Sequence, residues 1–348
     1  MKDLHPARWA EPADGRGKIR CSLCPRGCQL GLDQAGFCFI RQNRDGKLIT
    51  LGYGRTTGFA VDPIEKKPLN HFYPATGILS FGTVGCNLGC KFCQNWTSSR
   101  ARSFGHRGEL VTPADVVKLA ELEGCPSIAF TYNEPIIFAE FAIDVAGLAH
   151  ERGIKTVAVT AGYISPAARS EFFAHMDAAN VDLKSMSEQF YRKLSAAHLA
   201  PVLETLDYLA RETKVWVEVT NLVIPGHNDS EAELDKLSGW VVEHMGVDTP
   251  IHFSAFHPDF RLSEIERTPS STLARARELA QKNGARHVYT GNIHDAKGQS
   301  TYCPRCGELV IGRQGFRVSP YRLDEKGHCS SCGGAIAGRF GAAAGQVS

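Results

Sequence analysis

Apolar and polar residues are distributed along the chain from about residue 77 onward in a pattern that predicts alternating strands and helices. Short apolar runs of strand length are separated by longer stretches in which apolar residues recur at helical spacing. We expect strands over 77–84, 127–132, 153–159, 180–184, 215–221, 250–255 and 286–290. We expect helices over 113–123, 135–151, 165–175, 187–210 with a break, 230–244 and 270–283.

This alternation predicts parallel strands joined by right-handed crossovers, in a doubly wound sheet or in a barrel. Thr112-Pro113 and Thr268-Pro269 offer caps for the first and last helix. A barrel is favoured because polar residues and possible metal ligands directly follow the strands, where barrel active sites collect. Cysteines also replace the Gly-rich loop of a dinucleotide-binding fold after the first strand. The expected fold is α/β, a full or partial (β/α)6 TIM-like barrel.

The chain divides into three expected parts. Residues 1–70 are rich in Gly, Pro and Cys and predict a metal-binding segment. Residues 71–296 carry the strand and helix pattern of the barrel, and residues 297–348 carry a paired-cysteine pattern followed by a tail of small residues.

Bulk properties narrow the class of protein. The 348 residues carry a net charge of +2, so they form no broad basic field for nucleic acid. No apolar run is long enough to span a membrane, and the N-terminus lacks the apolar core of a signal peptide. We therefore expect a soluble, cytoplasmic protein in which the twelve cysteines bind metals more readily than they form disulfides.

Three cysteines follow the first expected barrel strand in the stretch GTVGCNLGCKFCQN, residues 82–95. Cys86, Cys90 and Cys93 can bind three irons of a cubane cluster and leave the fourth iron open to a small chelating molecule. The alternative is zinc with a distant fourth ligand, or unliganded thiols. The odd number and the position after a strand favour the open cluster.

This loop resembles the CxxxCxxC signature of radical SAM enzymes, including an aromatic residue, Phe92, before the third cysteine. In that family the open iron chelates S-adenosylmethionine (SAM), and one electron cleaves it to methionine and a 5′-deoxyadenosyl radical. Several further stretches between about residues 77 and 260 are similar to activating enzymes of pyruvate formate-lyase. The resemblance implies a radical SAM barrel and an electron donor of the flavodoxin or ferredoxin type.

Two of these stretches imply contacts with the methionine part of SAM. TYNEP, residues 131–135, aligns with a Gly-Gly-Glu-Pro element, so Glu134 is expected at the amine and Asn133 replaces a glycine. VTAGY, residues 159–163, has Val159 where the family has an acidic residue, and Thr160 is the expected substitute.

Three later stretches imply the remaining SAM contacts. Lys184 in VDLKSM is expected to pair with the methionine carboxylate, because an ammonium group supplies a compact positive charge. Asn221 opens a segment that packs on adenine and ribose in the family, and His257 corresponds to a histidine near the ribose. An ordinary strand-end ion pair and an ordinary hydrogen-bonded histidine are the alternatives for Lys184 and His257.

Two further cysteine groups flank the barrel, each with enough thiols for a closed metal site. The C-terminal group has the paired spacing of a zinc ribbon, and the N-terminal group suits either a structural zinc ion or a second 4Fe–4S cluster. The groups are Cys303, Cys306, Cys329 and Cys332, and Cys21, Cys24, Cys28 and Cys38.

The order of these groups is similar to that in the radical SAM member of the AmmeMemoRadiSam system, which implies Memo-like and AMMECR-like partners. We expect an enzyme that abstracts hydrogen from a peptide or protein substrate, in the manner of a glycyl-radical activase. The alternatives are a metal-binding adaptor of the same fold without turnover, or radical modification of RNA or a small molecule. The near-neutral charge disfavours RNA.

Overall fold

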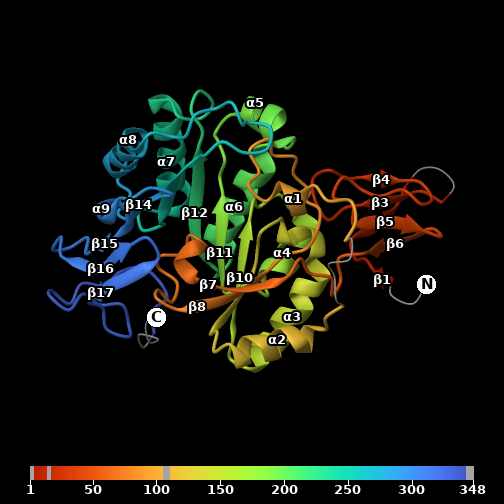
Figure 1. Ribbon diagram of the computed structural model, residues 1–348, viewed down its shortest axis with the longest axis horizontal. Coiled ribbons are helices and arrows are strands. Elements are labelled where there is room, and N and C mark those ends of the chain that lie inside the picture. The colour runs from red at the N-terminus through yellow and green to blue at the C-terminus, as the bar shows by residue number, and fades with distance from the viewer. Residues whose placement is uncertain (1–3, 14–16, 105–109, 342–348) are drawn as a thin grey trace.

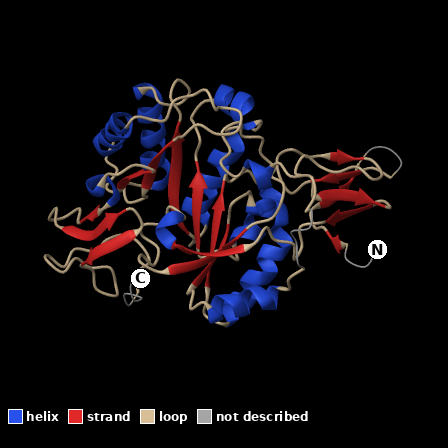
Figure 2. Ribbon diagram, viewed as in Figure 1, coloured by secondary structure: helices blue, strands red, loops and turns tan. Residues whose placement is uncertain are grey.

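The computed structural model describes residues 4–13, 17–104 and 110–341. A central sheet with helices packed on it occupies the middle of the molecule (Figures 1 and 2). Small N-terminal sheets lie at one end, and a C-terminal ribbon lies at the other. No helix in these described ranges is both long and apolar enough to span a bilayer.

The central sheet has eight strands in strictly sequential order, from β7 at one edge to β14 at the other. All neighbours from β8 to β14 pair in parallel, whereas β7 pairs antiparallel with β8. The strands are β7 (Phe59–Pro63), β8 (Gly77–Phe81), β9 (Ser127–Phe130), β10 (Lys155–Thr160), β11 (Ala178–Asp182), β12 (Trp216–Val223), β13 (Ile251–Ala255) and β14 (Val288–Gly291).

This order confirms the barrel expectation and excludes the doubly wound alternative. A doubly wound sheet reverses its strand order at a switch point, whereas a barrel sheet adds each new strand on the same side. Within the described residues β7 and β14 do not pair with each other, so the barrel is partial and open between these two edges.

Helices occupy the crossovers where the sequence pattern placed them, and short helical turns add to them. Ala196, with φ 49°, follows η3 and makes the expected break between residues 187 and 210. The helices are η1 (Ile64–Lys66), α1 (Trp96–Ser99), α2 (Pro113–Leu122), η2 (Pro135–Phe138), α3 (Ala139–Glu151), α4 (Pro166–Phe173), α5 (Glu188–Phe190), η3 (Tyr191–Ser195), α6 (Ala200–Glu212), α7 (Glu231–Met245), α8 (Ser270–Lys282) and α9 (Ala296–Gln299).

One of the two expected helix caps is confirmed and the other is wrong. Thr112 caps α2 in a reciprocal capping box with Asp115. The cap position of α8 is Pro269, with no side-chain cap bond. The Thr268 hydroxyl instead donates to the Val223 carbonyl at 2.6 Å and accepts the Phe256 amide at 2.9 Å, so it joins the ends of β12 and β13.

The N-terminal segment forms two three-stranded antiparallel sheets, in the orders β1-β6-β5 and β2-β3-β4. The division at residue 70 stays a prediction, and β7 before it pairs into the barrel sheet. The N-terminal strands are β1 (His5–Pro6), β2 (Ala10–Pro12), β3 (Ile19–Cys21), β4 (Gln29–Leu30), β5 (Arg41–Arg44) and β6 (Lys47–Thr50).

The C-terminal ribbon consists of β15 (Thr301–Tyr302), β16 (Leu309–Gln314) and β17 (Arg317–Tyr321). It lies beside β14 and β7, the two open edges of the barrel (Figure 1). Arg313 Nη2 donates to the Asn70 carbonyl at 2.7 Å, and the Tyr289 hydroxyl on β14 contacts Thr301 Oγ1 at 2.7 Å. The ribbon therefore covers the lateral opening.

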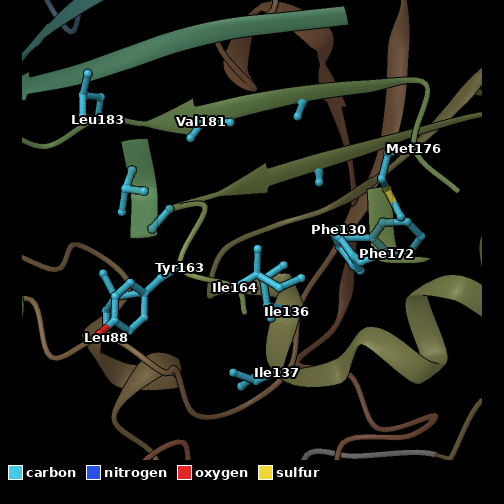
Figure 3. Packing of buried hydrophobic residues seen from close by; sticks show 14 of the residues in the cluster. Leu88, Phe130, Ile136, Ile137, Tyr163, Ile164, Phe172, Met176, Val181 and Leu183 are labelled. Carbon is cyan, nitrogen blue, oxygen red and sulfur yellow. The ribbon is translucent and has the colours of Figure 1, made fainter. Parts of the chain in front are cut away.

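The main hydrophobic cluster fills the space between the sheet and its helices and extends into the N-terminal segment. Figure 3 shows side chains of this cluster from β9, from β11 and from the loops after the strands, including Phe130, Val181 and Tyr163. The strand ends that follow this core are consequently held in fixed positions.

Candidate functional site

A cavity of about 820 Å³ lies over the carboxyl ends of the parallel strands. The residues that line it come from the loops after β8, β9 and β11 and from strands β10, β12, β13 and β14. The segment after β7, the segment after β14 and the C-terminal ribbon complete the lining. Ligand sites in barrels are built at this end of the strands.

Cys86, Cys90 and Cys93 all line this cavity, on the loop that follows β8. Asn133 holds the start of the loop, because its Nδ2 donates to the Gly85 carbonyl at 2.8 Å and its Oδ1 accepts the Thr83 amide at 3.1 Å. Both polar atoms of Asn133 are thus used to shape the cysteine loop.

Burial raises the pKa of the Cys86 and Cys90 thiols. Iron binds thiolates, so assembly of a cluster here releases protons. The three thiols share one cavity with room beside them, which fits a cluster that keeps one position open.

Glu134 follows β9 and is almost completely buried on the cavity wall. Its carboxylate accepts the Thr160 hydroxyl at 2.5 Å and the Ala161 amide at 2.7 Å. Burial raises the pKa of Glu134 to about 7, and these donors oppose the rise. The predicted residues Glu134 and Thr160 are therefore brought together, and Thr160 fixes the orientation of the carboxylate.

Lys184 lies just after β11 and also lines the cavity. Its Nζ donates to Asp182 Oδ2 at 2.8 Å and lies 5.7 Å from the centre of the Phe92 ring. Burial lowers the pKa of Lys184, but the Asp182 and Cys90 charges outweigh it and raise the pKa above the ordinary value. Lys184 is therefore a permanent cation close to the cysteine loop.

The structure does not bring the last two predicted SAM contacts to the cavity wall. Asn221 is buried in β12, where its Nδ2 donates to the carbonyls of Leu183 and Lys184 at 2.8 and 3.1 Å. It supports the backbone that carries Lys184. His257 is exposed after β13, and its ring contacts the neighbouring Pro258 carbonyl at 3.4 Å.

Several polar residues of the cavity wall were missed by motif reasoning. His252 lies on β13 and donates to Glu218 on β12 at 2.7 Å. Arg313 enters the wall from the ribbon, and its Nε lies 3.7 Å from Glu65. The sequence does contain a signal for such residues. In WVEVTN and IHFSA an ionisable residue, Glu218 or His252, stands inside an apolar run, and an ionisable side chain buried in this way needs a polar partner.

The C-terminal cysteines form a compact metal-ligand group. Their ligand sulfurs all lie within 4.8 Å of one another, and no other group of three or more His, Cys, Asp or Glu in the described ranges is gathered so closely. The Sγ atoms of Cys303 and Cys332 are 3.6 Å apart, and those of Cys306 and Cys329 are 3.8 Å apart. Four thiolates in this arrangement suit one tetrahedral ion.

Comparison with known proteins gives the family. Residues 81–237 match the sequence profile of the Radical SAM superfamily. "Uncharacterized protein MJ0808" of Methanocaldococcus jannaschii is 42% identical over 331 residues, which cover 95% of this chain and 98% of that protein. The pyruvate formate-lyase-activating enzyme of Clostridium pasteurianum is 24% identical over 203 residues, or 52% of this chain and 81% of that enzyme.

A solved structure shares the fold over most of the chain. The crystal structure of a radical SAM methyltransferase from Sphaerobacter thermophilus superposes with a TM-score of 0.52 at 16% identity, over 85% of this chain and 80% of that one. The three-cysteine loop lies within the residues that match the family profile. The chain therefore belongs to the radical SAM superfamily, whose members hold a 4Fe–4S cluster and SAM.

Proposed function

We propose that this enzyme cleaves SAM reductively and uses the 5′-deoxyadenosyl radical to abstract hydrogen from a peptide or protein substrate. The observation that carries the proposal is that Cys86, Cys90 and Cys93 line a single cavity together with Glu134 and Lys184. A cluster held by these cysteines supplies one electron to SAM when it is reduced.

The chain's own residues hold the two ends of the methionine moiety. Lys184 supplies a buried cation for the carboxylate, and the Glu134 carboxylate accepts an amine N–H. Thr160 keeps Glu134 oriented through its hydroxyl. The SAM contacts of Asn133, Asn221 and His257 are proposals that rest on the sequence resemblance.

A protein or peptide substrate is supported by two observations. The similar enzyme of Clostridium pasteurianum is named as an activating enzyme of another protein. The cavity of about 820 Å³ lies in the upper part of the range for ligand sites, so it leaves space next to a bound SAM molecule. Flavodoxin or ferredoxin is the proposed electron donor.

The flanking features complete the proposal. We propose zinc as the ion of the C-terminal ribbon, because four thiolates at these distances suit tetrahedral zinc. Memo-like and AMMECR-like proteins are the proposed partners, and this part rests on the order of the sequence motifs alone.

Isotope transfer from a perdeuterated cell extract tests the substrate class. The extract is separated into protein, RNA and small-molecule fractions, and each is incubated anaerobically with the reconstituted enzyme, SAM and a reductant. The proposal predicts deuterium in 5′-deoxyadenosine with the protein fraction, and loss of that transfer after protease treatment. Deuterium transfer from the RNA or small-molecule fraction alone would contradict it.

A further inference from the structure

The four N-terminal cysteines form a second thiol site that the proposed function does not use. Cys21, Cys24, Cys28 and Cys38 line a small space of about 20 Å³ that is separate from the large cavity. Cys21 and Cys38 are buried, and Cys24 and Cys28 are partly exposed. Four thiolates around one space provide a closed metal site, and the spacing of their sulfurs distinguishes a single ion from a cluster.

The C-terminal ribbon shows, within the same chain, the sulfur–sulfur distances expected of a site for a single ion. Its sulfur pairs are 3.6 and 3.8 Å apart, close to the edge of about 3.8 Å expected for a tetrahedron with Zn–S bonds of about 2.3 Å. Across the described residues, no three of the N-terminal sulfurs lie within 4.8 Å of one another. In the described structure they therefore do not form the compact, single-ion arrangement of the ribbon thiols.

A cubane cluster accounts for the wider spacing, because each thiolate binds a different corner iron. The loop after β8, called the SAM loop here, carries Cys86, Cys90 and Cys93. In the described structure the sulfurs of these three cysteines are likewise not gathered within 4.8 Å of one another. The N-terminal group thus resembles the cluster loop of this chain more closely than it resembles the ribbon.

The site also holds a fixed hydrogen-bond donor to sulfur. Arg41 Nε donates to Cys21 Sγ at 3.2 Å. Arg41 is itself buried and oriented by Glu140, whose two oxygens lie 2.8 and 3.0 Å from Arg41 Nη1. Hydrogen bonds to sulfur tune the reduction potential of iron–sulfur clusters, so this contact has a function in a redox site.

The N-terminal site lies directly against the SAM loop. Asn87, the residue after Cys86, lines the same small space as the four cysteines. The backbone of Gly85 passes so close to the Cys38 carbonyl that a Cβ at this position would collide with it. Arg26 Nε donates to the Asn87 carbonyl and joins the two segments.

We propose that Cys21, Cys24, Cys28 and Cys38 bind a second 4Fe–4S cluster, which passes single electrons to the cluster at the SAM loop. An external donor of the flavodoxin or ferredoxin class is oxidised by one electron, and the N-terminal cluster is reduced by one. That electron then reduces the SAM-loop cluster, and no bond or proton changes. The electron-acceptor role rests on the proposed function, whereas the binding of the second cluster does not.

The first test removes the SAM-loop ligands from the full chain. The triple variant Cys86→Ala, Cys90→Ala, Cys93→Ala is reconstituted anaerobically with iron and sulfide, then analysed for iron, sulfide and zinc and by EPR after reduction. We expect about four irons and four sulfides per chain, an EPR signal of a reduced cluster, and one zinc ion from the ribbon. A chain with no iron and two zinc ions would overturn the proposal. SAM cleavage plays no part in this readout, so its result is independent of the proposed function.

The second test concerns the route of the electron. The double variant Cys24→Ala, Cys28→Ala should keep about four irons at the SAM loop. We expect SAM cleavage driven by reduced flavodoxin to fall at least about tenfold relative to cleavage driven by dithionite, which reaches the SAM-loop cluster directly. Equal loss with both reductants would contradict the relay.

A third variant covers the case in which the double variant does not fold. Arg41→Lys in the triple-variant background keeps all four N-terminal thiols and the positive charge, but it removes the directed N–H···S contact. We expect a shift in the midpoint potential of the remaining EPR signal. An unchanged potential would contradict placement of the cluster against Cys21.

Discussion

Two buried ionisable side chains, Glu134 and Lys184, lie in the cavity next to the three-cysteine loop. A charge in the interior is costly unless it is paired or hydrogen-bonded. Asp182 compensates Lys184, and Thr160 and Ala161 donate to Glu134. Each pairing leaves the functional group on the cavity wall, where a zwitterionic ligand can reach it.

Removal of the Lys184 cation should weaken SAM binding. We expect Lys184→Ala to raise the dissociation constant of SAM on the reconstituted enzyme about 10- to 100-fold, because a hydrogen bond to a charged group contributes about 1.5–3 kcal/mol. Anaerobic titration calorimetry measures it. Lys193→Ala, at an exposed lysine of the following turn, is the matched control and should bind as the wild type does. Equal affinity of Lys184→Ala and the control would contradict the assignment.

The raised pKa of Glu134 predicts a pH dependence of SAM binding. Since burial raises this pKa to about 7, the folded enzyme holds a protonated carboxyl below that pH and an accepting carboxylate above it. SAM affinity should therefore increase as the pH rises from about 6 to about 8. Glu134→Gln should bind more weakly and lose this dependence. The same pH profile in both proteins would disprove the assignment.

Single residues also mark the limit of prediction from sequence. The cysteine loop, Glu134 and Lys184 were predicted to share a site because each follows a strand, and strand ends meet in a parallel barrel. His257 also follows a strand, yet its side chain is exposed and does not line the cavity. Position after a strand specifies the end of the barrel but does not specify the direction of a side chain in a loop.

At the level of elements, the alternation of apolar runs was sufficient to predict the parallel strands and the main helices. The edge strand β7 was missed, because Phe59–Pro63 ends in proline and pairs in the sheet with β8 alone. Thr268 was expected to cap α8 and does not, again because its role depends on a tertiary contact. Its hydroxyl is used by β12 and β13, a tertiary contact that no local pattern contains.

Glu218 joins several elements inside the barrel. It accepts the backbone amides of Asn70 and His71 at 2.9 and 2.7 Å, Trp216 Nε1 at 3.0 Å and His252 Nε2 at 2.7 Å. Burial alone would raise the pKa of Glu218, but these donors lower it from 4.5 to about 2. The carboxylate therefore ties β12 to β13 and to the segment after β7.

This network predicts a loss of stability in acid. A depressed folded-state pKa contributes stability that is complete above about pH 4.5 and is lost as the pH falls toward 2, of the order of 3 kcal/mol in total. Glu218→Gln should lower the unfolding free energy of the metal-free chain near neutral pH, with a smaller difference from wild type below pH 4.5. Urea unfolding at several pH values measures it. Glu123→Gln, at an exposed glutamate, is the control, and an equal effect of the two variants would contradict the network.

At the scale of the whole molecule, the ribbon completes a barrel that is open between β7 and β14. His71 Nδ1 donates to the Ala337 carbonyl at 2.6 Å, so its Nε2 accepts the Tyr289 hydroxyl at 2.5 Å. Thr301 contacts that hydroxyl and accepts Arg313 Nη1 at 2.9 Å. This continuous chain of hydrogen bonds links the barrel to the ribbon and places Arg313 in the cavity wall.

Loss of the ribbon metal should therefore open the cavity without unfolding the barrel. We expect Cys306→Ser to lose one metal ion per chain and to become sensitive to protease first within residues 301–340, because an ion bound by the four thiolates would hold the ribbon together. Metal analysis and limited proteolysis measure this. Cys125→Ser, a buried cysteine outside all three metal groups, is the control. A ribbon that stays resistant after complete metal loss would contradict this account.

The central claim is that the three-cysteine loop and its neighbours form a SAM-cleaving site. The direct measurement is 5′-deoxyadenosine formed by the anaerobically reconstituted chain with SAM and dithionite, compared with the Cys90→Ala variant. We predict product from the wild type and none above background from the variant. No product from a wild-type chain with an intact cluster, or equal product from both proteins, would contradict the account.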